Sequence, residues 1–159
     1  EFKRLYDENA MIAEVFFDLI SKWPERYGGM TLRDLADEMH TFKKENRMCV
    51  LLQEAFSLLP EPVLTYAEAY RRLVRNEVEK ITVAEAGNRI AATGIVPYPP
   101  GIPLLAPGER TGAPDAPVLR YLMTMQEFDR RSPGFEHDTH GIENVNGTYM
   151  MNCIVENRP

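Results

Sequence analysis

Apolar residues recur along the first 23 positions of the chain at the spacing of one helical face. They stand three, four or seven residues apart, as in an amphipathic helix, at Phe2, Leu5, Ile12, Phe16, Leu19 and Trp23. Pro24 disfavours helical backbone in the residue before it, so the pattern predicts one helix that ends at Trp23. The pattern begins with neither an initiator methionine nor a capping residue, and we therefore expect a piece of a longer polypeptide.

Two more helices are predicted before residue 61. Thr31 followed by Asp34 resembles a capping box, so a second amphipathic helix is expected from there to about Glu45. The stretch "RMCVLLQEAFSLLP" (47–60) is apolar around most of its circumference. It therefore predicts a third, deeply buried helix, which the prolines at its end would stop.

A fourth helix is predicted from Thr65, which forms a closer match to a capping box with Glu68. Its expected apolar face is made of Tyr70, Leu73, Val74 and Val78. Three arginines interleave with these residues and are expected on the solvent-exposed side, at Arg71, Arg72 and Arg75.

After residue 79 the sequence becomes rich in β-branched residues, glycine and proline, with no sustained helical period. The expected elements are a strand at about 80–84, a turn or single helical turn around 85–91, and strands at 92–98 and 102–106. A last helix fits 115–131, with one face made of Val118, Tyr121, Leu122, Met125 and Phe128. In the tail, Asn146–Gly147 is a strong hairpin-turn signal. We predict an α+β fold in which N-terminal helices pack on a small, mostly antiparallel sheet formed by the C-terminal half.

Composition narrows the protein class. A chain of 159 residues with 44% hydrophobic and 26% charged residues is typical of one globular domain, here 1–159. No apolar run is long enough to span a bilayer, so we expect no membrane partner. A net charge of −6 argues against nucleic acid, which needs a concentrated basic face. Cys49 and Cys153 lie far apart and are expected to be ordinary buried thiols in a reducing, cytoplasmic setting.

Candidate chemistry is sparse. The usual nucleotide-binding and hydrolase signatures are absent from the sequence. His137 and His140, with Glu136 beside them, have metal-ligand residue types, but the flanking glycines and proline make convergence on one ion unfavourable. We interpret this segment as a polar loop, hydrogen-bonded at an interface, and predict no metal site.

Carboxylates and lysines give no catalytic centre either. Asp129, Glu136 and Asp138 are close in sequence, but acid–base catalysis needs a pair held in different environments, which proximity alone does not establish. A Schiff-base lysine must be desolvated to lower its pKa. Four of the five lysines lie in polar helical stretches, and Lys80 begins a strand beside Glu79. We therefore expect no catalytic residue in this chain.

The stretch "IVPYPPGIPLLAPGE" (95–109) combines stiffness with apolar character. Its prolines force an extended or polyproline path and remove backbone donors, which restricts the stretch to sheet edges and turns. Its apolar residues nevertheless favour burial: Ile95, Val96, Tyr98, Ile102, Leu104 and Leu105. Two interpretations remain, a surface that packs against other protein and a stiff turn inside its own domain.

Two sequence blocks also carry a family resemblance. "ATGIVPYPPGIPLLAPGE" and, after a helix, "SPGFEHDTHGIENVNGTYMMNCIV" resemble the C-terminal domain of the bacterial ornithine/lysine/arginine decarboxylases, which are pyridoxal-phosphate enzymes of fold type I. The resemblance runs over essentially the whole chain. It is most specific at residues 97–109 and 133–141.

The resemblance implies a parent enzyme that removes the α-carboxylate of a basic amino acid, with arginine slightly favoured over lysine or ornithine. In this family a lysine preceded by histidine holds the pyridoxal phosphate, and no lysine here fits that pattern. The resemblance therefore implies that the cofactor and catalytic residues lie in an upstream large domain. It also implies that this chain packs on that domain, lines part of the substrate approach and joins contacts of a homodimer or higher oligomer.

The residues that we assign to the substrate approach or interface are Tyr98, Pro99, Pro100, Gly101, Glu109, Glu136, His137 and Asp138. Three of them, Glu109, Glu136 and Asp138, would attract a cationic substrate electrostatically. Two alternatives stay open, a stand-alone interaction or ligand-sensing module without a cofactor, and a small metal-dependent enzyme centred on His137 and His140.

Overall fold

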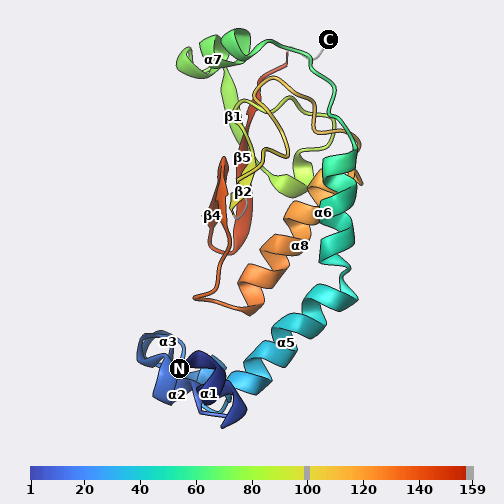
Figure 1. Ribbon diagram of the computed structural model, residues 1–159. Coiled ribbons are helices and arrows are strands. Elements are labelled where there is room, and N and C mark those ends of the chain that lie inside the picture. The colour runs from blue at the N-terminus through green and yellow to red at the C-terminus, as the bar shows by residue number, and fades with distance from the viewer. Residues whose placement is uncertain (99–100, 157–159) are drawn as a thin grey trace.

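Helices occupy most of the first half of the chain, and strands lie in the second half around one long helix (Figure 1). The computed structural model describes residues 1–98 and 101–156. Within these residues, the eight helices are α1 (Phe2–Asp7), α2 (Ile12–Val15), α3 (Phe17–Lys22), α4 (Pro24–Tyr27), α5 (Leu32–Glu45), α6 (Met48–Ser57), α7 (Tyr66–Val74) and α8 (Pro117–Arg131). A 3-10 turn, η1 (Val83–Glu85), and five strands complete the fold: β1 (Val78–Thr82), β2 (Val96–Tyr98), β3 (Asp138–His140), β4 (Ile142–Val145) and β5 (Thr148–Ile154).

The single helix predicted for residues 2–23 is wrong, because the structure breaks this segment into α1, α2 and α3. The chain turns at Asn9, which has a left-handed φ of 55°, and leaves helical geometry again at Phe16. Between these breaks, the Ile12 amide donates to the Met30 carbonyl at 2.9 Å, so a tertiary contact replaces a helical hydrogen bond. The predicted end at Trp23 is correct, since Trp23 caps α3 and Pro24 then opens α4.

The predicted span of α5 is confirmed, whereas the predicted deep burial of α6 is wrong. The Thr31–Asp34 capping box is formed, and α5 ends at Glu45. Helix α6 is not deeply buried, because only one of its sides packs on α8 and the residues after it, Leu58 and Leu59, are 58% and 93% exposed. Cys49 on α6 is likewise exposed, which corrects the prediction of two buried thiols.

Helix α7 begins at the predicted capping box of Thr65 and Glu68 but buries only Ala69. Its expected apolar face is wrong: Tyr70 and Val74 are exposed, and Val78 belongs to β1 instead. The three arginines are exposed, as predicted. Helix α7 thus lies on the outside of the molecule beside β1 (Figure 1).

The main sheet has the strand order β1-β5-β4, and both pairings are antiparallel. Strand β1 starts two residues before the predicted strand at 80–84 and pairs along β5 from Val78 opposite Ile154. The predicted tail hairpin is confirmed, because β4 and β5 meet at Asn146 and Gly147, with φ of 52° and 81°. Two successive positive φ values are the geometry of a tight hairpin turn, which Asn-Gly adopts readily.

A second, two-stranded sheet pairs β2 with β3. The strand predicted at 92–98 is shorter than expected, and none forms at 102–106, where Ile95 and Leu105 make only an isolated bridge. Pro103 disfavours a strand at 102–106, because it has no amide hydrogen to donate to a ladder.

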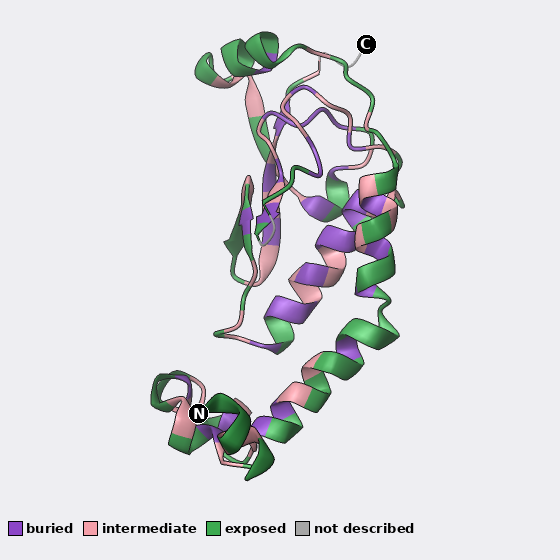
Figure 2. Cartoon of the chain, in the orientation of Figure 1, coloured by how far each residue is buried: buried purple, intermediate pink, exposed green. Residues whose placement is uncertain are grey.

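Helix α8 supplies the centre of the main core (Figure 2). All five residues predicted for its apolar face are buried: Val118, Tyr121, Leu122, Met125 and Phe128. The α+β class is confirmed. Within it, α6 and α8 build the main core with the β5 side of the sheet, whereas α1–α4 and the start of α5 form a second, smaller core. Among the described residues, no helix is both long and apolar enough to cross a membrane.

Candidate functional site

The two blocks that carry the sequence resemblance lie against each other. Strand β2 comes from the first block and β3 from the second, and their pairing places Tyr98 opposite Asp138 and Val96 opposite His140. Residues that are 40 to 44 positions apart in the sequence therefore meet at one place. We call Tyr98 together with residues 101–103 the tip.

The tip is exposed and apolar. Tyr98 is 60% and Ile102 is 52% exposed, and Gly101 also faces solvent. Gly101 has a φ of 80°, and its amide donates to the Pro97 carbonyl at 3.0 Å, which reverses the chain after β2. Pro99 and Pro100, two of the predicted site residues, lie outside the described residues.

The rest of the 95–109 stretch belongs to the protein's own core. Ile95, Leu104 and Leu105 are 0%, 4% and 1% exposed, and all three are part of the main core. The interpretation as a partner-seeking surface is therefore wrong for these three residues, which make a stiff turn inside the domain. The interpretation as a surface that packs against other protein stays open for the tip.

Of the three predicted acidic residues, the structure places Asp138 beside the tip. Asp138 is exposed and pairs across from Tyr98, and Glu136 is exposed two residues earlier. Glu109 is held elsewhere: its carboxylate accepts a hydrogen bond from the Ala106 amide at 2.7 Å, and its backbone forms a bridge with Pro62. The Glu136 carboxylate is bonded in a similar way within its own loop, since it accepts from the Gly134 amide at 2.8 Å.

A buried carboxylate holds the segment that leads into β3. Asp129, on the last turns of α8, is 3% exposed. Its oxygens accept from the His137 amide at 3.1 and 3.2 Å, contact the His137 ring Nδ1 at 2.7 Å, and accept a short hydrogen bond from the Tyr149 hydroxyl. The His137 ring also stands edge-on to Phe128, with centroids 5.0 Å apart.

The Tyr149 hydroxyl remains protonated in this setting. Burial raises the pKa of Tyr149 far above its ordinary value, and the hydrogen bond to Asp129 raises it further. The phenol is therefore a permanent donor to the carboxylate. Sequence reasoning missed this network, although Asp129 lies four residues after Met125 and so falls on the buried face of α8. A carboxylate at a position where the helical period predicts a buried apolar residue could have indicated this network.

The loop before β3 also joins the two cores. The Tyr27 hydroxyl donates to the Pro133 carbonyl at 2.6 Å, and Phe135 stands edge-on to Phe16 and Tyr27, with centroids 6.0 and 6.3 Å apart. Gly134 packs so closely on this core that an added Cβ would lie 2.3 Å from Leu19. The "PGFE" sequence therefore anchors the loop on the N-terminal helices.

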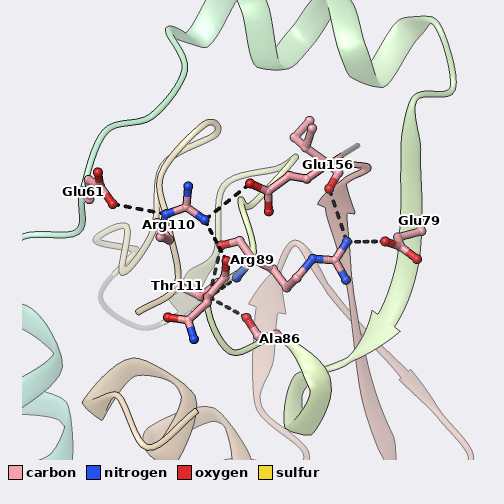
Figure 3. A network of polar contacts seen from close by, with 9 residues as sticks. Glu61, Glu79, Ala86, Arg89, Arg110, Thr111 and Glu156 are labelled. Carbon is pink, nitrogen blue, oxygen red and sulfur yellow. Dashed lines mark hydrogen bonds and ion pairs between the residues drawn. The ribbon is translucent and has the colours of Figure 1, made fainter. Parts of the chain in front are cut away.

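A second polar network fixes the far end of the 95–109 stretch (Figure 3). The Arg110 guanidinium pairs with Glu61 at 3.1 Å and Glu156 at 3.5 Å, and donates to the Asn88 carbonyl at 2.8 Å. Beside it, the Thr111 hydroxyl donates to the Ala86 carbonyl at 2.5 Å. These contacts tie the loop to the segment before α7 and to the end of β5, with the positive charge balanced.

Buried Arg89 completes this network from the sheet side (Figure 3). Its guanidinium forms an ion pair with Glu79 on β1 and donates to the Ile154 carbonyl at 3.3 Å. The Arg89 guanidinium thus binds the sheet, while the Arg89 backbone bonds to Thr111 just after the loop. Both the Arg89 and the Arg110 guanidinium groups are paired with carboxylates.

The described residues offer neither a desolvated lysine for pyridoxal phosphate nor a cluster of metal-ligating side chains. All five lysines are exposed, and two of them, Lys3 and Lys80, pair with carboxylates. None has the desolvated surroundings that a Schiff-base lysine requires. Within residues 1–98 and 101–156, no three His, Cys, Asp or Glu side chains come together as a possible metal site, so the metal-enzyme alternative has no geometric support.

An exposed apolar surface that sequence reasoning missed runs from the end of α6 to α7. Among the described residues, six of the 13 exposed large apolar side chains lie within residues 58–74, a much higher density than elsewhere. They are Leu58, Leu59, Val63, Tyr66, Tyr70 and Val74. Leu58 and Leu59 border a groove of about 380 Å³ whose floor includes Leu104 and Val118. Patches of this kind are typical of protein–protein contacts.

Comparison with protein families gives one match, to the model described as the C-terminal domain of Orn/Lys/Arg decarboxylases, over residues 49–155. Among curated proteins, the chain is 42% identical to the biodegradative arginine decarboxylase of Escherichia coli and 41% identical to the lysine decarboxylase LdcA of Pseudomonas aeruginosa. These alignments cover 96% and 98% of this chain but 20% and 21% of the relatives. The chain thus spans about a fifth of the length of the curated relatives that it matches.

Solved structures show the same likeness. The constitutive lysine decarboxylase of E. coli matches with a TM-score of 0.87 and 35% identity, over 97% of this chain and 22% of that one. Lysine decarboxylase A from P. aeruginosa matches with a TM-score of 0.88 and 39% identity, over 97% of this chain and 21% of that one. The fold of nearly the whole chain is therefore similar to that of about a fifth of each of these longer chains.

Proposed function

This chain belongs to the family of Orn/Lys/Arg decarboxylase C-terminal domains, and from that membership we propose that it is the non-catalytic C-terminal domain of a pyridoxal-phosphate-dependent decarboxylase. The observation that carries the proposal is the family match over residues 49–155, together with relatives about five times as long as this chain. On this proposal, residues 1–159 are one domain of a polypeptide whose large domain lies upstream.

The cofactor and the catalytic residues are proposed to lie in that large domain. Pyridoxal phosphate, when bound, acts as an electron sink that stabilises the carbanion left by loss of carbon dioxide. The exposure of all five lysines supports placing its attachment outside this chain. The part proposed for this chain is to pack on the large domain, to line the substrate approach and to join oligomer contacts in a cytoplasmic homodimer or larger homo-oligomer.

The tip and its acidic neighbours are the proposed contact with the substrate approach. An exposed apolar tip supports docking on another protein surface. Asp138 beside it, and Glu136 two residues earlier in the chain, supply negative charge for a cationic amino acid. The substrate is a basic amino acid, and arginine is preferred. Identities of 42% and 41% to an arginine and a lysine decarboxylase are too similar to separate these two substrates, so the preference stays a prediction.

The decisive experiment is to purify the full-length protein that contains this chain and to measure its decarboxylation of arginine, lysine and ornithine. We expect activity on at least one of them, with the highest kcat/KM for arginine. Residues 1–159 expressed alone should retain no pyridoxal phosphate after desalting. Activity on none of the three substrates would contradict the proposal, and so would stoichiometric cofactor in the isolated domain.

The role of the acidic pair is tested in the same enzyme by the double variant Glu136→Gln/Asp138→Asn. We expect its kcat/KM to fall about fivefold at low salt and less at high salt, because attraction between exposed charges is screened. Glu109→Gln is the matched control, since it neutralises a carboxylate that also accepts from a nearby backbone amide, Ala106 for Glu109 and Gly134 for Glu136. Glu109, however, is bridged to Pro62 instead of lying near β3. An unchanged kcat/KM and salt dependence in the double variant would exclude electrostatic guidance by these residues.

A further inference from the structure

Asp129 is the one buried carboxylate in residues 1–98 and 101–156, and its position is costly in two ways. A carboxylate loses most of its hydration when it is buried. Near the end of α8 it also meets the negative end of the helix dipole. Within the described chain no lysine or arginine pairs with it, so compensation must come from its contacts with His137 and Tyr149.

Each of its described side-chain partners comes from outside α8. His137 contributes the backbone amide and the ring nitrogen, and Tyr149 contributes its hydroxyl. Both carboxylate oxygens are used, because Oδ1 contacts the ring and Oδ2 receives the phenol. Asp129 therefore connects α8 to the loop before β3 and to β5 at a single point.

The residue that Asp129 holds comes immediately before β3. The β2–β3 pairing is only three residues long, and one of them is Pro97, which has no amide hydrogen to donate. So short a ladder sets its own register weakly, and a slip of one residue would turn each side chain to the opposite face. The register must therefore be fixed by contacts at the two ends of β3.

Those two ends are fixed in different ways. At the far end, Gly141 lies so close to Gly94 that an added Cβ would be 2.1 Å from the Gly94 carbonyl oxygen. At the near end, Asp129 binds both the main chain and the side chain of His137. Between them, the pairing brings Asp138 opposite Tyr98, where both are exposed.

From this geometry we propose that Asp129 is a positioning residue: through His137 it sets the β2–β3 register and so presents Tyr98 and Asp138 together at the surface. The value of that arrangement to the enzyme rests on the proposed function of the tip. Asp129 itself touches neither the tip nor the exposed acids, and it acts through the segment that it anchors.

The test uses the full-length decarboxylase with Asp129→Asn, which keeps the size of the side chain but removes its charge and one acceptor oxygen. We expect amide hydrogen exchange in residues 96–98 and 137–140 to quicken about tenfold. KM for the preferred amino acid should rise about fivefold, with kcat within twofold of the parent. Glu127→Gln is the matched control, because it makes the same change on the same helix in a carboxylate that pairs with Arg130 and Arg131 at the surface.

His137→Ala serves as a second variant if Asp129→Asn does not fold, since it removes the ring contact and leaves the carboxylate and the backbone amide. We expect a smaller increase of exchange in the same two segments. Unchanged exchange there, in Asp129→Asn or, if that is unfolded, in His137→Ala, would overturn the proposal. Faster exchange with an unchanged KM would support Asp129 as the positioning residue and would instead contradict the function proposed for the tip.

Discussion

At the scale of single residues, Gly141 allows a close main-chain contact at the candidate site. Its φ of 84° lies in the left-handed region, and the space for a Cβ is taken by the Gly94 carbonyl, a backbone group that cannot move aside cheaply. The glycine thus lets β3 approach the segment that leads into β2. By contrast, Gly29 has an ordinary φ, and an added Cβ there would meet nothing within 4 Å.

We predict that Gly141→Ala lowers the free energy of unfolding by about 2–4 kcal/mol, because strain at the left-handed position adds to a main-chain clash. Gly29→Ala should change it by less than about 0.5 kcal/mol. Urea unfolding of the two variants, followed by circular dichroism, measures both values. Equal urea midpoints for the two variants would show that the close approach of Gly141 to Gly94 does not contribute to stability.

At the scale of elements, the N-termini of α5, α7 and η1 are capped in the same way. The hydroxyl groups of Thr31, Thr65 and Thr82 each accept from the amide three residues on, and each returning carboxylate accepts from the threonine. These hydrogen bonds lower the pKa of the carboxyl groups, chiefly through the Thr65 hydroxyl at Glu68 and through the Thr31 amide at Asp34. The stabilisation therefore depends on pH.

The direction of the pH dependence follows from the linkage between proton binding and folding. A carboxyl group whose pKa is lower in the folded protein contributes stability above its ordinary pKa, 4.5 for Glu68, and loses it as the pH falls through the folded value. We predict that Glu68→Gln lowers the thermal midpoint at pH 7 and that the difference from the parent shrinks towards pH 3. Glu45→Gln, an exposed change at the end of α5, is the control. A difference that stays constant from pH 7 to pH 3 would contradict the assignment.

Elements with local signals were predictable, and those without were not. The start and end of α5 follow from a capping box and a sustained apolar period, and the β4–β5 turn follows from Asn-Gly. The break after α1 has only a weak local signal, the tolerance of Asn9 for a left-handed φ, and it is accompanied by a tertiary contact from the Ile12 amide to the Met30 carbonyl. Periodicity describes which residues are buried together, and it does not require that one helix carries them.

At the scale of the whole molecule, two cores are joined by α5 and by the loop after α8 (Figure 1). The loop contact is specific: Phe135 stands against Phe16 and Tyr27, and the Arg26 side chain donates to the Arg131 carbonyl at 2.9 Å. The N-terminal helices therefore sit against the segment that leads to His137 and the tip.

We predict that Phe135→Ala lowers the free energy of unfolding by about 2 kcal/mol. The loss is smaller than for a fully buried phenylalanine, because this ring is half-buried. Hydrogen exchange should quicken in α1–α4 more than in β1 or β5, since the variant removes the contact between the cores. Phe17→Ala, which removes a ring that is 76% exposed, is the control. Uniform quickening in both cores would show that they unfold as one unit.

The sequence by itself determined the α+β class, the boundaries of α5, the buried face of α8, the tail hairpin and the family, because these rest on local capping, periodicity, turn chemistry and two distinctive blocks. Only the tertiary structure decided that Ile95, Leu104 and Leu105 belong to the protein's own core, since a proline-rich apolar stretch suits either side of a surface. It also decided that Glu109 stands apart from Asp138 and that Asp129 holds His137. These facts depend on which distant segments meet, and local physical chemistry does not determine that.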